Sequence, residues 1–196
     1  YRKNIDLGEV SKKTRFYLVF DGVYMNADVW LNGEHIRHQQ YGYIGFEIDV
    51  TPYVRLDTIN VLAVRTDCSS LPVDRWYSGA GIFRHVRLIA TEKLHFPEYN
   101  TRILTSVEQD IASVKAQIEV KNSDDKTRRF KLKTDLIAPD GTLVKSLISS
   151  RSAEAGETVV IEENLVIEDP ALWSPGEPNL YEIHSFLLFK KKVADD

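Results

Sequence analysis

The segment best suited to chemistry is residues 67–81, DCSSLPVDRWYSGAG, which is rich in turn-forming residues and interrupts two strand-like runs. It contains Asp74, Arg75 and Trp76, followed by Tyr77. Aromatic rings stack on the apolar face of a pyranose, while carboxylate and guanidinium groups form directional hydrogen bonds with hydroxyls. The segment is therefore a candidate sugar-binding loop. The structural alternative is that Trp76 fills the end of a sandwich and Arg75 pairs with Asp74.

Two pairs of adjacent acids, Asp124-Asp125 and Glu162-Glu163, are the other candidates for chemistry. Hydrolysis of a glycosidic bond needs two carboxyl groups that flank the scissile bond. The first pair lies in a polar turn, and the second lies on a predicted strand, where neighbouring side chains point to opposite faces. We therefore interpret both pairs as solvated charges and predict no catalytic residue in this chain.

The five histidines do not form a metal-binding pattern. Only His35 and His38 are close in sequence, and a spacing of three on a strand places two side chains on opposite faces. The sequence also lacks a G-x-S-x-G elbow, a phosphate-binding G-x-x-x-x-G-K-[ST] loop and a C-x-x-C pair. We predict no metal site and no cofactor.

Composition and charge exclude several classes of protein. Apolar residues make up 43% and charged residues 28% of the 196, as in an average soluble globular protein. The net charge of -4 and the lack of a long apolar run argue against nucleic-acid and membrane partners. The single Cys68 cannot form an intrachain disulfide, so the location stays open between cytoplasmic and periplasmic or extracytoplasmic. Because the sequence begins with Tyr1 instead of methionine, we expect it to be part of a longer protein.

The elements that must position these residues carry strand signals. Residues 14–20, TRFYLVF, alternate large apolar side chains on both faces, which is typical of a strand buried on both sides. The pair Asn32-Gly33 lies between two β-prone runs and predicts a type I′ hairpin. Further strands are predicted at 45–50, 60–66 and 85–90.

The second half shows the clearest alternation of the chain. In residues 113–121 every second side chain is apolar and the others are polar, which indicates a sheet with one solvated face. A turn at 139–141, Pro-Asp-Gly, predicts another hairpin, and strands at 159–167 and 180–189 complete an immunoglobulin-like series. Trp30 and Trp173 are predicted to lie in the core.

Three stretches together resemble glycoside hydrolase family 2, and in particular its β-galactosidase branch. The first is DGVYMNADVWLNG at 21–33, followed by YGYIGFEIDVTPYV at 41–54. The second is RWYSGAGIFRHVRL at 75–88, and the third is DPALWSPGEPNLY at 169–181. Their order and spacing extend the resemblance over nearly the whole chain.

The resemblance implies an all-β chain: a jelly-roll, galactose-binding-like sandwich over 1–92, incomplete at its N-terminus, and an immunoglobulin-like β-sandwich over 93–196. It also implies a parent retaining β-galactosidase that acts on β-galactosides with two glutamates on a (β/α)₈ barrel outside this chain. Asp74 matches an aspartate that reaches the galactose pocket in the family, and Arg75 and Trp76 are expected beside it. The chain alone is then inactive and shapes the rim of the pocket.

Two other functions stay open. The first is a stand-alone carbohydrate-binding module that uses residues 74–77. The second is a tandem sandwich with a purely structural, adhesion-like role. The oligomeric state of the parent and the choice of sugar also stay open, because glucuronidases and mannosidases of the same family share these front domains.

Overall fold

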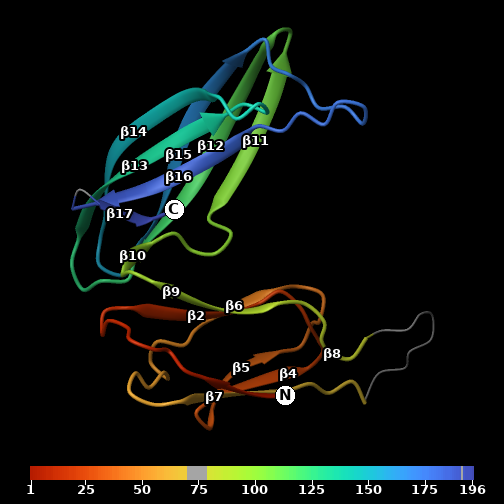
Figure 1. The fold of residues 1–196 in the computed structure, drawn as a ribbon, viewed down its shortest axis with the longest axis vertical. Helices are drawn as coiled ribbons and strands as arrows, with labels where there is room; N and C mark the ends of the chain where they lie inside the picture. The colour runs from red at the N-terminus through yellow and green to blue at the C-terminus, as the bar shows by residue number, and fades with distance from the viewer. Residues whose placement is uncertain (70–78, 191) are drawn as a thin grey trace. The chain divides into compact units, whose positions relative to one another are not determined.

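The computed structural model describes residues 1–69, 79–190 and 192–196, and all regular elements in these ranges are β-strands (Figure 1). The prediction of an all-β chain is confirmed. The chain divides into two compact units, Tyr1–Thr91 and Glu92–Asp196. We call them unit 1 and unit 2 and describe each by itself. In the described ranges, no helix is long and apolar enough to cross a membrane.

Unit 1 is a sandwich of two antiparallel sheets, with strand orders β1-β7-β4-β5 and β6-β2-β9, and it also contains the separate short pair β3-β8. Its strands are β1 (Arg2–Ile5), β2 (Arg15–Phe20), β3 (Val23–Tyr24), β4 (Ala27–Leu31), β5 (Glu34–Gln39), β6 (Phe46–Asp49), β7 (Asn60–Arg65), β8 (Gly81–Ile82) and β9 (Val86–Thr91).

The central strand of unit 1 is β2, as its residue pattern predicts. Five of its six residues are buried, and β6 and β9 pair with it on its two sides. Phe20 is fully buried and its ring stacks on that of Phe46, with centroids 4.7 Å apart. Burial of such a side chain contributes about 1.5–3 kcal/mol, so these rings are a main source of stability in unit 1.

The predicted hairpin at Asn32-Gly33 is confirmed. Asn32 has φ 55° and Gly33 has φ 91°, which is the pair of positive angles that a type I′ turn requires. The Asn32 side chain donates to the Tyr53 carbonyl and to Asn60 Oδ1, both at 2.8 Å. The turn is thereby fixed to the buried Asn60 of β7.

A cleft of about 450 Å³ lies in unit 1 between β1 and β9. Each of these strands has a single hydrogen-bonded neighbour among the described strands, so both are sheet edges. Apolar residues of the sandwich interior, such as Leu18 and Leu62, contribute to its lining. Unpaired strand edges can pair with another strand. The cleft between these two edges also gives access to apolar surface of the sandwich interior.

Unit 2 is a second sandwich. One sheet has the order β10-β12-β11 with β15 also paired to β12, and the other has the order β14-β13-β16-β17. Its strands are β10 (Leu94–His95), β11 (Thr101–Glu108), β12 (Ile111–Asn122), β13 (Arg128–Ile137), β14 (Leu143–Ala153), β15 (Thr158–Glu168), β16 (Glu182–Phe189) and β17 (Lys192–Asp195).

The alternation predicted for residues 113–121 is present in β12. Val114, Ala116, Ile118 and Val120 are buried between the sheets of unit 2, while the side chains between them face outward. The predicted turn at 139–141 joins β13 to β14, with the Gly141 amide donating to the Ala138 carbonyl at 2.9 Å. The sequence pattern therefore fixes both the strand and the hairpin.

The prediction that Trp173 lies in the core is wrong, because its side chain is 59% exposed. It belongs to the segment between β15 and β16, which forms no strand and is held by local hydrogen bonds. The Glu177 amide donates to the Ser174 carbonyl at 3.1 Å, and Asn179 Nδ2 donates to the Leu172 carbonyl at 3.1 Å. These bonds close the segment on itself, and Trp173 in it is exposed. Trp30 is half-buried, on β4.

Candidate functional site

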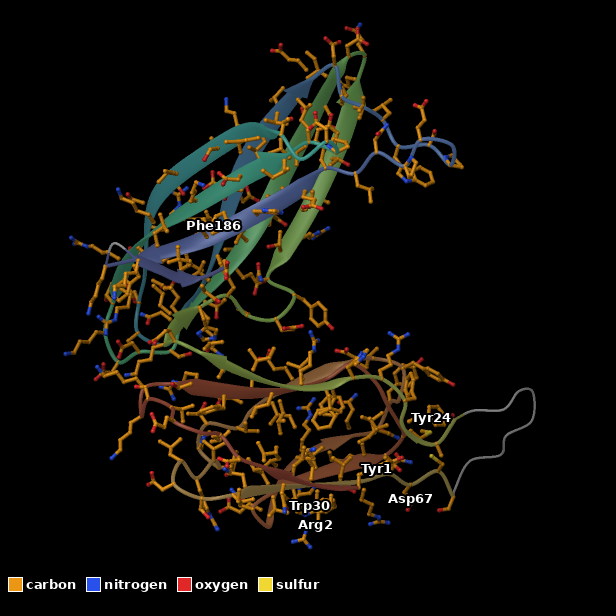
Figure 2. All side chains as sticks on the ribbon, viewed as in Figure 1. Tyr1, Arg2, Tyr24, Trp30, Asp67 and Phe186 are labelled. Carbon is orange, nitrogen blue, oxygen red and sulfur yellow. The ribbon has the colours of Figure 1, made fainter. Side chains whose placement is uncertain are left out.

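The predicted sugar-contacting residues Asp74, Arg75 and Trp76 lie outside the described residues, and so does Tyr77. Their roles therefore stay predictions. The structure does describe where the loop that carries them leaves β7 and where it returns to β8. Both places are in unit 1, and Figure 2 labels Tyr24 and Asp67 at this end of the sandwich.

The first stem of the loop, at Asp67 and Cys68, is tied to the segment that follows β3. The Asp67 amide donates to the Met25 carbonyl at 3.0 Å, and Asn26 Nδ2 donates to the Asp67 carbonyl at 3.0 Å. The Cys68 thiol lies 3.5 Å from the Tyr24 carbonyl and acts as a weak donor to it. Three contacts therefore fix the start of the loop.

The carboxylate of Asp67 stabilises the same stem. It accepts hydrogen bonds from the Ser69 hydroxyl at 2.6 Å and the Ser69 amide at 3.0 Å, and Arg65 pairs with its other oxygen at 2.9 Å. The two bonds from Ser69, and then Arg65, hold the pKa of Asp67 below its usual range. Asp67 thus stays ionised at neutral pH and holds the local turn.

The second stem of the loop pairs with β3, the strand that precedes the contacts of the first stem. Gly81 pairs with Tyr24, and Ile82 pairs with Val23, in the antiparallel pair β3-β8. Gly81 has φ 102°, a conformation that favours glycine. Both stems of the candidate loop are therefore anchored on β3 and the residues directly after it.

Four aromatic side chains gather around this anchor, and we call Tyr24, Tyr41, Tyr43 and Phe83 the aromatic patch. The Tyr43 ring lies 5.1 Å from that of Tyr24, 5.8 Å from that of Tyr41 and 6.4 Å from that of Phe83, measured between centroids. These spacings are those of ordinary aromatic pairs. The patch was not predicted, although the stretches YGYIGF and GIFR carry three of its aromatic residues.

The adjacent acids have structural partners. Glu162 and Glu163 do point to opposite faces of β15, as predicted. Glu162 is exposed and accepts from Gln117 Nε2 at 2.6 Å, whereas Glu163 is buried and accepts from the Ser149 hydroxyl at 2.7 Å. The interpretation of Glu163 as a solvated charge is wrong, because its face of the strand packs inside the sandwich.

Asp124 is also not a solvated charge, and that interpretation is wrong for it as well. Its side chain is 2% exposed and binds Lys93 Nζ at 2.9 Å and Arg128 Nε at 2.7 Å. Lys93, then Arg128, hold the pKa of Asp124 far below its usual range. This carboxylate is part of an ion cluster that joins the start of unit 2 to β13.

The histidine pair also differs from the prediction. His35 Nε2 and His38 Nδ1 both contact Asp28 Oδ1, at 2.8 and 2.9 Å. A register shift between Val29 and Trp30 adds a residue to β5, so two positions three apart reach one face. Hydrogen bonds from His35 and then His38 keep the pKa of Asp28 below its usual range. Within the described ranges, no group of three or more His, Cys, Asp or Glu side chains is arranged to hold a metal ion.

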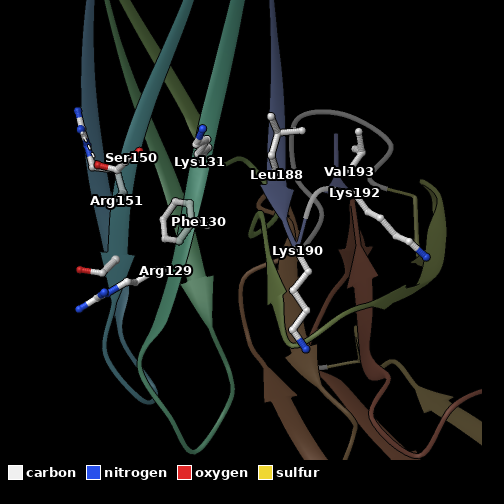
Figure 3. A pocket seen from close by; sticks show the side chains of 10 residues that line it. Arg129, Phe130, Lys131, Ser150, Arg151, Leu188, Lys190, Lys192 and Val193 are labelled. Carbon is white, nitrogen blue, oxygen red and sulfur yellow. Dashed lines mark hydrogen bonds between the residues drawn. The ribbon is translucent and has the colours of Figure 1, made fainter.

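A larger cleft, of about 920 Å³, lies on unit 2 (Figure 3). Its lining includes five cationic residues, Arg129, Lys131, Arg151, Lys190 and Lys192. Among the described residues its lining contains no carboxylic acid, and glycoside hydrolysis needs two carboxyl groups. Volume alone therefore does not identify the site.

Family comparison agrees with this architecture. Residues 1–92 match the sugar binding domain of glycosyl hydrolases family 2, and residues 95–196 match glycosyl hydrolases family 2. The chain belongs to glycosyl hydrolases family 2. The resemblance carried by the three sequence stretches is thereby confirmed, and the two matched ranges correspond to β-sandwich domains of the family.

Relatives of this family 2 chain are named for two activities. A β-galactosidase of Bacteroides ovatus is 36% identical over 196 residues, which are 100% of this chain and 23% of the relative. A putative β-glucuronidase of Formosa agariphila is 34% identical over 197 residues, 100% of this chain and 18% of the relative. The chain thus spans about a quarter or less of the length of these two relatives.

Solved structures show the same fold for this family 2 chain. A glycosyl hydrolase family 2 member from Bacteroides cellulosilyticus superposes with a TM-score of 0.92 at 34% identity, over 99% of this chain and 27% of that one. A Bacteroides uniformis β-glucuronidase gives 0.93 at 28% identity, over 99% of this chain and 25% of that one. Both units therefore have counterparts within longer glycosidases.

Proposed function

We propose that this chain is the non-catalytic N-terminal part of a retaining β-galactosidase-like glycoside hydrolase. In this proposal unit 1 shapes the rim of the sugar pocket through the loop 67–81, and both units support a catalytic barrel elsewhere in the polypeptide. The barrel supplies the two glutamates that act as acid/base and nucleophile. The substrate is a β-galactoside, and the proposal includes no cofactor bound by this chain.

The anchoring of both loop stems on β3 is the observation that carries the proposal for the rim. A side chain that orients a sugar hydroxyl must be held in place, because hydrogen bonds depend strongly on distance and angle. Asp67, Cys68 and Gly81 each bond or pair with residues 24–26, so the loop leaves a fixed base. Asp74 is the residue that we expect to contact the sugar, with Arg75 and Trp76 beside it.

The exposed segment between β15 and β16 supports the scaffolding part of the proposal. Trp173 is 59%, Leu172 58% and Leu180 67% exposed. Large apolar side chains that are exposed together mark surfaces that contact another domain or protein. Because the segment is held by its own hydrogen bonds, it presents these side chains in a fixed arrangement. We assign it to contact with the catalytic barrel.

Enzyme kinetics test the role of the loop. The 196-residue chain should release no measurable product from a chromogenic β-galactoside. In the longer polypeptide that includes the barrel, Asp74→Asn should lower kcat/KM roughly tenfold to a hundredfold, the effect of losing a charged hydrogen bond. The exposed Asp57 of unit 1 provides the matched control, and Asp57→Asn should leave kcat/KM unchanged. Wild-type kinetics in Asp74→Asn would refute the role of Asp74 at the rim.

Stability measurements test the docking segment. In the 196-residue chain, Trp173→Ala should change the free energy of unfolding by less than about 0.5 kcal/mol, because the side chain is exposed. In the longer polypeptide, the same change should lower the melting temperature, because an apolar contact with the barrel is lost. Equal, small effects in both contexts would show that Trp173 does not contact the barrel.

A stand-alone carbohydrate-binding module is the second candidate, and the sugar binding domain matched by residues 1–92 favours it. This function predicts that the isolated chain binds galactose or lactose with millimolar or tighter affinity. It also predicts that Trp76→Ala abolishes the binding. Calorimetric titration of the wild-type chain and of Trp76→Ala tests this candidate, and loss of binding in Trp76→Ala is the result that it requires.

A further inference from the structure

We propose that the aromatic patch is a second sugar-contacting surface, which stacks on a pyranose ring of a neutral oligosaccharide. The inference rests on the proposed function and deepens it. Asp74 is assigned to the sugar in the pocket, whereas the patch holds a sugar unit farther along the same substrate. None of the four residues of the patch is among those proposed to contact the sugar from the loop, which are Asp74, Arg75 and Trp76.

Exposure is the first argument. Tyr41 is 56%, Tyr43 53% and Phe83 45% exposed. Exposed apolar residues are ordinary when they are scattered singly, but here the rings are clustered and in mutual contact. An aromatic cluster left in water is a site where a partner can gain free energy by covering it.

The relative orientation of the rings is the second argument. Tyr43 is the hub, and the planes of its three neighbours are inclined to it by 58°, 66° and 63°. The four rings thus form no single stack in which each face covers the next. The faces of Tyr24, Tyr41 and Phe83 are therefore not covered by a parallel Tyr43 ring.

Two glycines hold the patch in place. A Cβ atom at Gly42 would lie 2.6 Å from Cδ2 of the Tyr24 ring, and a Cβ atom at Gly22 would lie 2.6 Å from Cζ of the Phe83 ring. Both rings therefore lie directly against bare backbone, which only glycine permits at this distance. Such packing restricts the rings before a ligand arrives, and this lowers the entropy cost of binding.

The chemistry of the patch fits a neutral sugar. Three of its four rings end in a hydroxyl group, and the Arg84 guanidinium lies 5.8 Å from the centroid of the Phe83 ring. Apolar faces and hydrogen-bonding groups therefore occur together, as recognition of a pyranose requires.

The position of the patch connects it to the substrate. Tyr24 is a member of the patch, and it also pairs with Gly81 and accepts the contact from Cys68. The patch and the two stems of the loop therefore share one residue. A linear substrate held by the loop would extend over neighbouring surface of unit 1, and the patch is part of that surface.

Heteronuclear NMR titration of the 196-residue chain with lactose and with cellobiose tests the inference. We expect shifts of the amide signals at Gly42, Tyr43 and Phe83, with saturation at millimolar sugar. Tyr43→Ala should weaken binding about threefold to tenfold, the value of one aromatic contact. Tyr43→Leu should show the same loss, and it separates removal of the ring from damage to the fold. Tyr99, 77% exposed in unit 2, is the matched control, and Tyr99→Ala should bind like the wild type.

Three outcomes would overturn the inference. The first is unchanged affinity in both Tyr43 variants, and the second is a set of shifts confined to the loop residues 74–77. The third is the absence of shifts at the patch with either sugar. Each of these leaves the role of Asp74 to be judged by the kinetics of Asp74→Asn. Conversely, wild-type kinetics in Asp74→Asn together with sugar shifts at the patch would refute the role of Asp74 and leave the inference about the patch intact.

Discussion

Replacing Asn122 by alanine is expected to destabilise unit 2 by about 3 kcal/mol or more. Asn122 is fully buried at the end of β12. Its amide nitrogen lies 2.8 Å from the Lys126 carbonyl, 3.1 Å from that of Ala153 and 2.8 Å from that of Glu154, and its oxygen accepts from the Asp124 amide at 3.1 Å. Alanine would leave several backbone groups without their partner in a place that excludes water.

Urea unfolding followed by the amide signals of β12 measures this effect. Asn164 is the matched control, because it lies on β15, in the same sheet, but is exposed. Asn164→Ala should change the free energy of unfolding by less than about 0.5 kcal/mol. If Asn122→Ala were no more destabilising than Asn164→Ala, the hydrogen bonds of Asn122 would not be the reason for its burial.

The second large effect concerns acid and the Asp124 cluster. Hydrogen bonds from Lys93 and then Arg128 lower the pKa of Asp124 in the folded chain, whereas the pKa of an unfolded aspartate is about 3.9. A carboxyl group with a lowered folded pKa contributes stability that is fully present above the unfolded pKa. That stability is lost as the pH falls below it toward the folded pKa. Unit 2 should therefore lose stability between about pH 5 and pH 2.

Asp124→Asn separates this contribution from that of other acids. At pH 7 the variant should unfold at a lower urea concentration than the wild type, because Lys93 and Arg128 lose their buried counter-charge. The difference between the two proteins should shrink as the pH falls to about 3 and below, where Asp124 of the unfolded wild type is protonated. Urea midpoints of unit 2 at pH 7, 5, 4 and 3 give the comparison. A constant difference across this series would contradict the prediction.

The urea midpoint of the variant must be compared with that of the wild type at each pH, because other carboxyl groups titrate in the same pH range. Burial raises the pKa of Asp195, whose carboxylate accepts the Phe96 amide at 2.7 Å. A raised folded pKa has the opposite sign, so protonation of Asp195 favours the folded chain as the pH falls. Asp195 is the same in both proteins, and its contribution cancels in the comparison.

Most strands could be predicted because their signals are local. In β2 and β12 the alternation of side chains has the period of a strand, and at Asn32-Gly33 the turn needs positive φ at two consecutive residues. The longest strand that was not predicted is β11. All eight of its residues are exposed, so no burial pattern marks it.

The positions of individual side chains depended on the tertiary structure. A bulge that is invisible in the spacing of His35 and His38 brings both rings to Asp28. Asp124 lies in a polar turn sequence, yet distant Lys93 and nearby Arg128 meet there and allow its burial. Trp173 is of a residue type that is typical of protein cores, but it is exposed and lies in a segment closed by its own hydrogen bonds.

The sequence by itself therefore determined the fold class and the family of this chain, because strand periods, turn residues and ordered motifs are encoded along the chain. It also named Asp74, Arg75 and Trp76 as candidates, which stay a prediction. The tertiary structure alone decided that both stems of their loop meet on β3 and that four aromatic residues from three segments form one patch. Such contacts join residues far apart in sequence, and only the pairing and packing of the strands bring them together.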